Sequence, residues 1–138
     1  SCYFEELRQD FEGAYYGMYF LELADYCTRE NNDEREVLKL LYQSLRALTV
    51  KSIPRRLVRC IYEIRLIVAN GEFPGLPQGN FSETALYAVE FIAGTPVEKL
   101  YTFTLKEEVL AELVQIAEKY RRDFLPGEFH TLEILETL

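Results

Sequence analysis

Apolar residues recur at every third or fourth position along almost the whole chain, whereas strict alternation of apolar and polar residues is hard to find beyond a few positions. A spacing of three or four residues places side chains on one face of an α-helix, and alternation would instead indicate a strand. The pattern therefore predicts an all-α fold. Capping and turn signals divide the chain into a compact bundle of about six or seven helices.

The first predicted helix is long or kinked and covers roughly residues 3–27. Apolar residues step through it by three or four positions, namely Phe4, Leu7, Phe11, Tyr15, Met18 or Tyr19, and Leu23. Its aromatic rings occupy more than one face: Tyr15, Tyr16, Tyr19, Phe20 and Tyr26. A surface helix turns one face to the core, so some of these rings are either exposed or covered by another surface. Core filling is the simpler interpretation, and a groove for a partner is the alternative.

Two further helices are predicted before the middle of the chain. A polar turn ends in Asn32 and Asp33, either of which can cap a second helix that runs to about Thr49. Pro54 closes the next connection, because proline disfavours helical geometry in the residue before it. The third helix then continues to the Asn-Gly pair at 70–71, a common signal for a helix C-terminus.

Glycine and proline punctuate the middle of the chain, where three Gly and two Pro fall within a ten-residue stretch. This composition predicts a loop that separates the bundle into two halves near residues 71–81. Capping patterns that begin at Ser82, Thr95 and Thr104 predict a helix, a short helix and a long helix, in that order. After the Leu-Pro-Gly sequence at 125–127, the spaced leucines of the tail predict a short closing helix or 3₁₀ turn.

The composition is that of one soluble globular domain. The chain has 138 residues, of which 49% are hydrophobic, and its ten Tyr and nine Phe supply an apolar core. No apolar run approaches the roughly 20 residues that a membrane span needs, so no membrane association is expected. Cys2, Cys27 and Cys60 form an odd number without a close pair, which favours reduced thiols in the cytoplasm. Two of them are expected to be buried and the third to be a terminal residue.

Residue types that carry catalysis or bind metals are scarce. His130 is the single histidine of the sequence and has no nearby Ser or Cys partner, so a structural role is expected for it. No nucleophile elbow, phosphate-binding loop or H-E-x-x-H motif occurs, and no two cysteines have the C-x₂₋₄-C spacing of a zinc site. The sequence therefore predicts a protein that is not an enzyme and that holds no cofactor or metal.

Positive charge is concentrated in one short region of an otherwise acidic chain. Residues 46–65 hold six basic residues and one acidic residue, whereas the net charge of the whole chain is -8. The six are Arg46, Lys51, Arg55, Arg56, Arg59 and Arg65. Arginine suits phosphate and carboxylate alike, and the alternative is a solvated face that pairs with acidic neighbours such as Glu63. Because an acidic chain repels nucleic acid at long range, this region is expected to act at close range.

Four stretches of the sequence carry recognisable motifs. They are Tyr15-x-x-x-Tyr19-Phe-Leu-Glu-Leu-Ala-Asp25, Val37-Leu-Lys-Leu-Leu-x-x-x-Leu45-x-x-Leu48, Tyr62-Glu-Ile-Arg-Leu66 with the following Gly71-x-x-Pro74-x-Leu76, and Leu132-x-x-x-x-x-Leu138. In this order they resemble the C-terminal helical domain of the bacterial RecO recombination mediator. The third stretch is the most specific and has Tyr62 in the family's aromatic position. Together the four stretches cover nearly the whole chain.

The resemblance implies that residues 1–138 are a single helical domain, excised from a longer protein with an upstream OB-fold that is absent here. Many members of the family carry two C-x-x-C pairs that bind a structural zinc ion. In this sequence Pro77-Gln78-Gly79-Asn80 stands in the place of the first pair, and no later pair exists. Zinc is therefore not expected.

The resemblance also implies a non-enzymatic function in DNA repair and recombination, in a bacterial cytoplasm and associated with the nucleoid. Such a mediator loads recombinase on single-stranded DNA coated by single-strand DNA-binding protein (SSB) and anneals complementary strands. RecR is an expected partner, and DNA is contacted mainly through the missing OB-fold. The helical domain would serve as a docking module for the acidic, Phe-ended tail of SSB, with an arginine at its terminal carboxylate.

The expected tail-binding residues are Arg55, Arg56, Arg59 and Tyr62, and the expected secondary basic or DNA contacts are Arg46, Lys51 and Arg65.

A second class of function also fits the sequence. It is a helical adaptor or oligomerisation domain unrelated to DNA, with the aromatic first helix as its interface.

Overall fold

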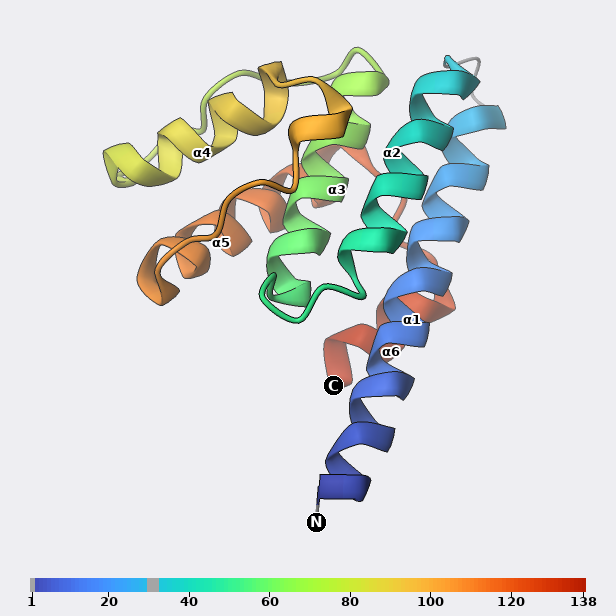
Figure 1. The fold of residues 1–138 in the computed structure, drawn as a ribbon. Coiled ribbons are helices and arrows are strands. Elements are labelled where there is room, and N and C mark those ends of the chain that lie inside the picture. Colours follow the sequence, from blue (N-terminus) through green and yellow to red (C-terminus); the bar gives the residue numbers. More distant parts are fainter. Residues whose placement is uncertain (1, 30–32) are drawn as a thin grey trace.

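The computed structural model describes residues 2–29 and 33–138, and the part that it describes is helical with no strand. The elements are α1 (Cys2–Arg29), α2 (Glu34–Ala47), α3 (Arg55–Ala69), α4 (Glu83–Gly94), the 3₁₀ helix η1 (Val97–Lys99), α5 (Glu107–Phe124) and α6 (His130–Thr137). The predicted all-α bundle is therefore confirmed (Figure 1). No helix in the described ranges is long and apolar enough to cross a membrane.

Helix α3 lies at the centre of the bundle (Figure 1). It packs against α1 and α2 on one side and against α4 and α5 on the other, while α6 packs against α1. One continuous apolar cluster contains residues from all six helices. The glycine- and proline-rich loop joins α3 to α4 as predicted, but the two halves share a core because both pack on α3.

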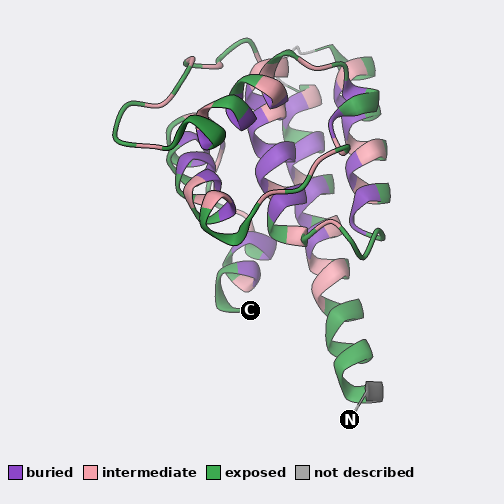
Figure 2. Ribbon diagram, turned by 60° about the vertical axis from the view of Figure 1, so that its left-hand side comes forward, coloured by how far each residue is buried: buried purple, intermediate pink, exposed green. Residues whose placement is uncertain are grey.

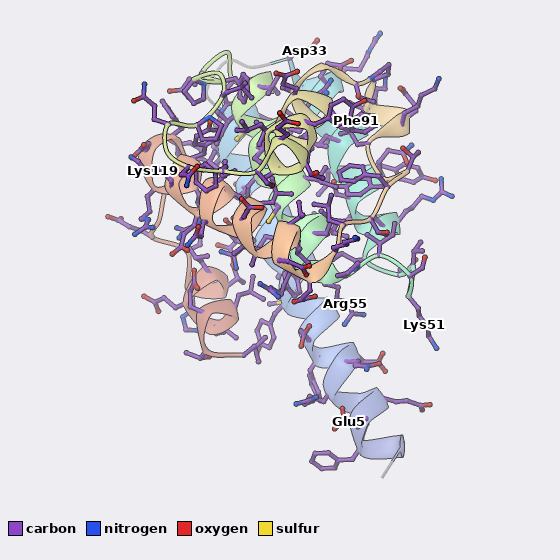
Figure 3. All side chains as sticks on the ribbon, turned by 90° about the vertical axis from the view of Figure 1, so that its left-hand side faces the viewer. Glu5, Asp33, Lys51, Arg55, Phe91 and Lys119 are labelled. Carbon is purple, nitrogen blue, oxygen red and sulfur yellow. The ribbon has the colours of Figure 1, made fainter. Side chains whose placement is uncertain are left out.

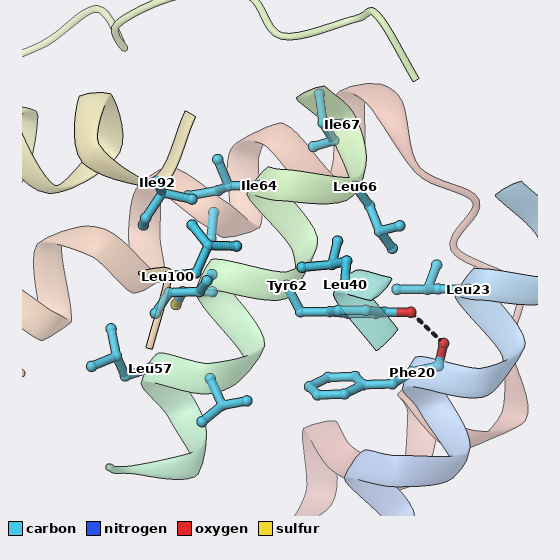
Figure 4. Close-up of a cluster of buried hydrophobic side chains, with 14 of the residues drawn as sticks. Phe20, Leu23, Leu40, Leu57, Tyr62, Ile64, Leu66, Ile67, Ile92 and Leu100 are labelled. Carbon is cyan, nitrogen blue, oxygen red and sulfur yellow. Dashed lines mark hydrogen bonds between the residues drawn. The ribbon is translucent and has the colours of Figure 1, made fainter. Parts of the chain in front are cut away.

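The aromatic residues of α1 divide between core and surface. Tyr16, Tyr19 and Phe20 are buried, so core filling accounts for them. The ring of Phe20 stacks on that of Tyr62 with 4.1 Å between centroids, and the Tyr62 hydroxyl donates a 2.6 Å hydrogen bond to the Phe20 carbonyl (Figure 4). Tyr26 stays partly exposed. These contacts fix α1 against α3 near the middle of both helices.

The first turns of α1 project beyond the body of the domain and are exposed (Figure 2). Three residues of the predicted apolar stripe, Phe4, Leu7 and Phe11, are therefore exposed and do not face the core. Of the two alternatives at the next step, Tyr19 is buried and Met18 is exposed. The buried face begins at Tyr16 and continues through Phe20 and Leu23. A step of three or four residues does not distinguish two apolar faces of one helix, which is why the sequence pattern merged them.

The helix ends agree with most of the capping signals. Asp33 accepts a hydrogen bond from the Arg35 amide at the start of α2, and Ser82 accepts one from the Ala85 amide at the start of α4. Gly71 follows α3 with φ +74°, a left-handed conformation that glycine adopts without strain. The alternative cap Asn32 lies outside the described residues, as does the side chain of Cys2. Cys27 and Cys60 are buried free thiols, as predicted.

Two of the predicted caps are wrong. Helix α5 begins at Glu107, and its N-cap is Lys106, which makes no side-chain capping bond, so Thr104 does not cap it. Leu105 packs against the core before the helix starts, and this contact keeps the chain extended there. Thr95 is the C-cap of α4, and the short helix that follows it is a 3₁₀ turn.

Arg65 is held in the fold as a cap for the C-terminus of α4. Its guanidinium donates to the carbonyl of Ile92 at 2.9 Å and to the carbonyl of Thr95. Carbonyls at a helix C-terminus lack partners within the helix and carry partial negative charge, so a positive donor is favourable there. This contact joins α3 to α4.

Arg65→Met, which keeps the aliphatic stem and removes the donors, is expected to lower the free energy of unfolding by about 1.5 to 3 kcal/mol. Arg46→Met is the control, because Arg46 is exposed and its guanidinium lies 5.7 Å from the ring of Tyr42 in its own helix. That control should cost less than about 1 kcal/mol. Urea unfolding followed by circular dichroism measures both, and equal losses would contradict the capping role.

Candidate partner-docking site

A buried carboxylate lies at the centre of the candidate site. Glu63, in the middle of α3, is 2% exposed. It accepts a 2.6 Å hydrogen bond from the Tyr19 hydroxyl on α1 and a 3.1 Å hydrogen bond from Nε of Arg59, one turn earlier on α3. Nε of Arg121 on α5 lies 3.9 Å from the same carboxylate. Burial raises the pKa of Glu63 above its ordinary value, while Arg59, the Tyr19 hydrogen bond and Arg121 act in the opposite direction.

A second carboxylate contacts the same two arginines from the outside. Glu136 on α6 lies 3.3 Å from Arg59 and 3.7 Å from Arg121, and its side chain is half exposed. Arg121 is 8% exposed, and its buried Nε has no hydrogen-bond partner within the described part of the chain. The two guanidinium groups therefore lie between an internal carboxylate and a solvent-facing one.

A cavity of about 370 Å³ opens beside these arginines. Arg56 and Arg59 line it from α3, and Arg121 lines it from α5. Its apolar lining includes Val114, Ala117 and Leu135. Glu136 and Leu138 border it from the end of the chain, and Glu12 and Tyr16 border it from α1. The cavity therefore combines an apolar wall with three guanidinium groups, each of which already contacts a carboxylate.

Of the four tail-binding residues expected from the sequence, Arg56 and Arg59 line this cavity. Arg56 is exposed and lies 3.2 Å from Glu107, itself 79% exposed. Arg59 is mostly buried and lies 5.3 Å from the ring of Tyr19. Screening by water makes the exposed Arg56 pair weak, so the Arg56 side chain is available to another anion.

Arg55 has a structural environment instead. Its guanidinium donates to the carbonyls of Leu48 and Gln9, and it packs against Gly13 of α1. A Cβ atom at Gly13 would lie 2.8 Å from Nη2 of Arg55, so glycine leaves the room that this contact needs. Arg55 thereby ties α1 to the α2–α3 connection, at the junction seen in Figure 3.

Tyr62 requires a correction, because it is fully buried in the core against Phe20 and does not reach the surface with the arginines. The secondary residues also separate. Arg65 caps α4, whereas Arg46 and Lys51 are exposed, and Lys51 points away from the body in Figure 3. The six basic residues of 46–65 therefore do not form one surface, and two of them join Arg121 at the cavity.

Arg121 and Glu136 are site residues that the sequence interpretation missed. Both are far from the basic region along the chain, so no local charge pattern connects them to it. A signal for Arg121 did exist, because it lies four residues after Ala117 and shares the inward face of α5. Nothing local marked Glu136 as the residue of α6 that meets Arg59.

A larger hollow, of about 600 Å³, lies between the loop at 74–81 and α5. The charged side chains beside it pair with each other: Lys119 with Asp123 at 2.7 Å, and Arg122 with Glu118 at 3.6 Å. It therefore offers no unbalanced charge to a ligand.

Within the described ranges, no three His, Cys, Asp or Glu residues gather as a metal site, and His130 is exposed beside Glu133.

Glu63→Ala is expected to lower the free energy of unfolding by about 3 to 5 kcal/mol, because it leaves two guanidinium groups and the Tyr19 hydroxyl without their buried partner. Glu136→Ala is a matched control that removes a half-exposed carboxylate from the same arginines, and it should cost less than about 1 kcal/mol. Urea unfolding measures both variants. Equal losses would contradict the central position given to Glu63.

The raised pKa of Glu63 sets the sign of its pH dependence. The folded protein binds this proton more tightly than the unfolded chain does. Its stabilising effect is therefore fully present below the ordinary carboxyl pKa and is lost as the pH rises through the folded pKa. The free energy of unfolding of the wild type should exceed that of Glu63→Gln by more in acid than at neutral pH. If this difference instead grew as the pH rose, the pKa of Glu63 would be lowered in the folded protein.

Comparison with known proteins agrees with this helical architecture. No curated protein and no solved structure matches the chain. A family model, described as the C-terminal part of recombination protein O, matches residues 8–79. This range runs from α1 through α3 into the loop after it and includes Arg56, Arg59 and Glu63. Since the match spans more than half of the 138 residues, the chain belongs to the recombination protein O C-terminal family, whose general role is in DNA recombination and repair.

Proposed function

We propose that this domain is the partner-docking module of a RecO-like mediator and that its cavity between α3, α5 and α6 binds the acidic, Phe-ended tail of SSB. The observation that carries the proposal is that Arg59 and Arg121 both border the cavity, with their Nε atoms toward the buried Glu63 and their Nη2 atoms toward Glu136 on the solvent side. A carboxylate in the place of Glu136 would make charge-assisted contacts with both guanidinium groups.

The chemistry of the cavity supports a peptide with a terminal carboxylate and an aromatic ring. Glu136 already brings a carboxylate to within 3.3 Å of Arg59 and 3.7 Å of Arg121. A terminal carboxylate can replace it, because half-exposed ion pairs are weak. Val114, Ala117 and Leu135 offer an apolar wall for the ring. Arg56, at the exposed side of the cavity, can meet a further acidic residue of the tail.

Membership of the family supports a wider proposal for the complete protein. We infer that the complete protein is not an enzyme, that it loads recombinase on SSB-coated single strands and anneals complementary strands, and that RecR is its partner. It would contact DNA mainly through an upstream OB-fold, in the bacterial cytoplasm. Of the three residues expected to make a secondary phosphate contact, Arg46 and Lys51 are exposed and available for it, whereas Arg65 is occupied by α4.

The terminal carboxylate of the peptide is expected to contribute most of the specific recognition. A fluorescent acidic peptide that ends in Phe should bind the wild-type domain, and the same peptide with a C-terminal amide should bind about tenfold more weakly, since a charged hydrogen bond contributes about 1.5 kcal/mol or more. Fluorescence anisotropy measures both affinities. This comparison changes the ligand and leaves the fold untouched.

Protein variants locate the same contact. Arg56→Ala and Arg121→Gln should weaken binding of the acid peptide, whereas Arg46→Ala, exposed but outside the cavity, should leave it unchanged. A thermal melt of each variant checks its folding. The proposed site would be contradicted if the acid and amide peptides bound with equal affinity, or if neither Arg56→Ala nor Arg121→Gln weakened binding of the acid peptide.

Glu136 occupies the position proposed for the terminal carboxylate, so its removal should strengthen binding. Glu136→Gln is expected to raise the affinity for the acid peptide by about three- to tenfold, which corresponds to the roughly 1 kcal/mol of an exposed ion pair. Glu133→Gln is the control, because Glu133 lies on the same helix and contacts His130 instead of the arginines. An unchanged or lower affinity for Glu136→Gln would show that Glu136 does not compete with the peptide.

A further inference from the structure

Helix α1 carries a second apolar face that points away from the core. The row consists of Phe4, Leu7, Phe11, Ala14, Met18 and Leu21. Ala14 is exposed, and the five larger residues are between 40% and 69% exposed. This row is separate from the buried face, which contains Tyr16, Tyr19, Phe20 and Leu23. The helix is therefore apolar on two sides, and the bundle covers one of them.

The spacing of the exposed row indicates what can cover it. The steps alternate between three and four residues from Phe4 to Leu21, so the six side chains occupy the a and d positions of three successive heptads. An apolar seam with a mean period of 3.5 residues fits along another α-helix, where each side chain enters a hole between four residues of the partner. At 1.5 Å per residue the seam is about 26 Å long.

From this seam we infer that α1 pairs with α1 of a second copy of the chain, in antiparallel orientation about a two-fold axis between positions 11 and 14. This arrangement places Phe11 against Ala14 of the other copy, so the large ring meets the small methyl group. The same axis places Phe4 against Leu21 and Leu7 against Met18. Because the axis repeats every contact, the seam is complementary to itself, as a two-fold interface requires.

Parallel pairing of two copies fits less well. It would place Phe11 against Phe11 and Ala14 against Ala14, so a wide layer would lie directly beside a narrow one. Close packing does not tolerate such an uneven seam without a void or a displaced ring. The antiparallel arrangement fills both layers evenly.

The flanking charges favour the same orientation. In antiparallel coiled coils the e positions of the two helices lie on one side, and here Arg8 and Glu22 both occupy e positions near opposite ends of the seam. The two-fold axis therefore brings Arg8 of each copy toward Glu22 of the other. The present partner of Arg8 is Glu5 of the same helix, in an exposed pair that is readily exchanged.

The shape of the domain leaves the seam accessible. The N-terminal turns of α1 extend beyond the body (Figures 1 and 2), so they can lie along α1 of another copy. Helix α2 packs on a different side of α1, where Leu45 lies 3.6 Å from the Cβ position of Gly17. None of the six seam residues lines the cavity that holds Arg59 and Arg121, so the inference does not depend on the proposed function.

Sedimentation equilibrium of the 138-residue chain, across micromolar to submillimolar concentrations, tests the inference. The wild type should show a monomer–dimer equilibrium. Phe11→Ser and Met18→Ser should weaken dimerisation at least tenfold with unchanged thermal melting, because both side chains are already exposed in the monomer. Tyr87→Ser, which removes an exposed ring from α4, is the matched control and should dimerise like the wild type.

Charge reversal and cross-linking test the orientation. Arg8→Glu should weaken the dimer, and adding Glu22→Arg should restore it. In a Cys2→Ser background, a mixture of Phe11→Cys and Ala14→Cys chains should form a disulfide under mild oxidation, whereas Ala14→Cys chains alone should not. A wild type that stays monomeric, a dimer that Phe11→Ser leaves unchanged, or efficient cross-linking of Ala14→Cys chains alone would overturn the inference.

Discussion

The arrangement of this domain depends on one constraint, which is that the buried carboxylate of Glu63 must be met by donors and by positive charge. Helix α3 is apolar around Glu63, and desolvation of an unpaired charge there would cost more than the domain could tolerate. Its partners come from three directions: Tyr19 on α1, Arg59 on α3 itself, and Arg121 on α5. Stacking of Phe20 on Tyr62 fixes α1 on α3 in the same layer. Charge neutralisation at Glu63 therefore joins Tyr19 of α1 and Arg121 of α5 to the central helix.

The same constraint builds the candidate site. Because Glu63 draws Arg59 and Arg121 toward the core, their remaining donor groups are held at fixed positions beside an apolar wall. A pair of arginines held in this way loses less conformational entropy on binding an anion than flexible surface residues would. Glu136 shows that these groups meet a carboxylate from the solvent side. A chain with a net charge of -8 can thus present a local anion-binding surface without attracting nucleic acid at long range.

Much of the fold was predictable because it rests on local signals. The helical period, the caps at Asp33 and Ser82, and the left-handed Gly71 are readable within a few residues of the chain. The motif around Tyr62 pointed to the family, although the buried ring serves the core and not the site. The distribution of arginines was not predictable, because each partner lies far away in sequence: Arg55 meets the carbonyl of Gln9, Arg65 meets the end of α4, and Arg121 meets Glu63. The failed cap at Thr104 has the same origin, since packing of Leu105 outweighs a capping pattern.

Backbone amide chemical shifts of the isotope-labelled domain, followed during titration with the acidic, Phe-ended peptide, test the central claim most directly. Binding in the cavity predicts shift changes in the first half of α3, along the side of α5 that carries Val114 and Arg121, and in α6, with contacts between the peptide ring and the methyl groups of Val114 and Leu135. Changes confined to the loop at 74–81 and the α5 residues Lys119 and Tyr120 would place the peptide in the other hollow. That result would contradict the assignment of tail docking to Arg59 and Arg121.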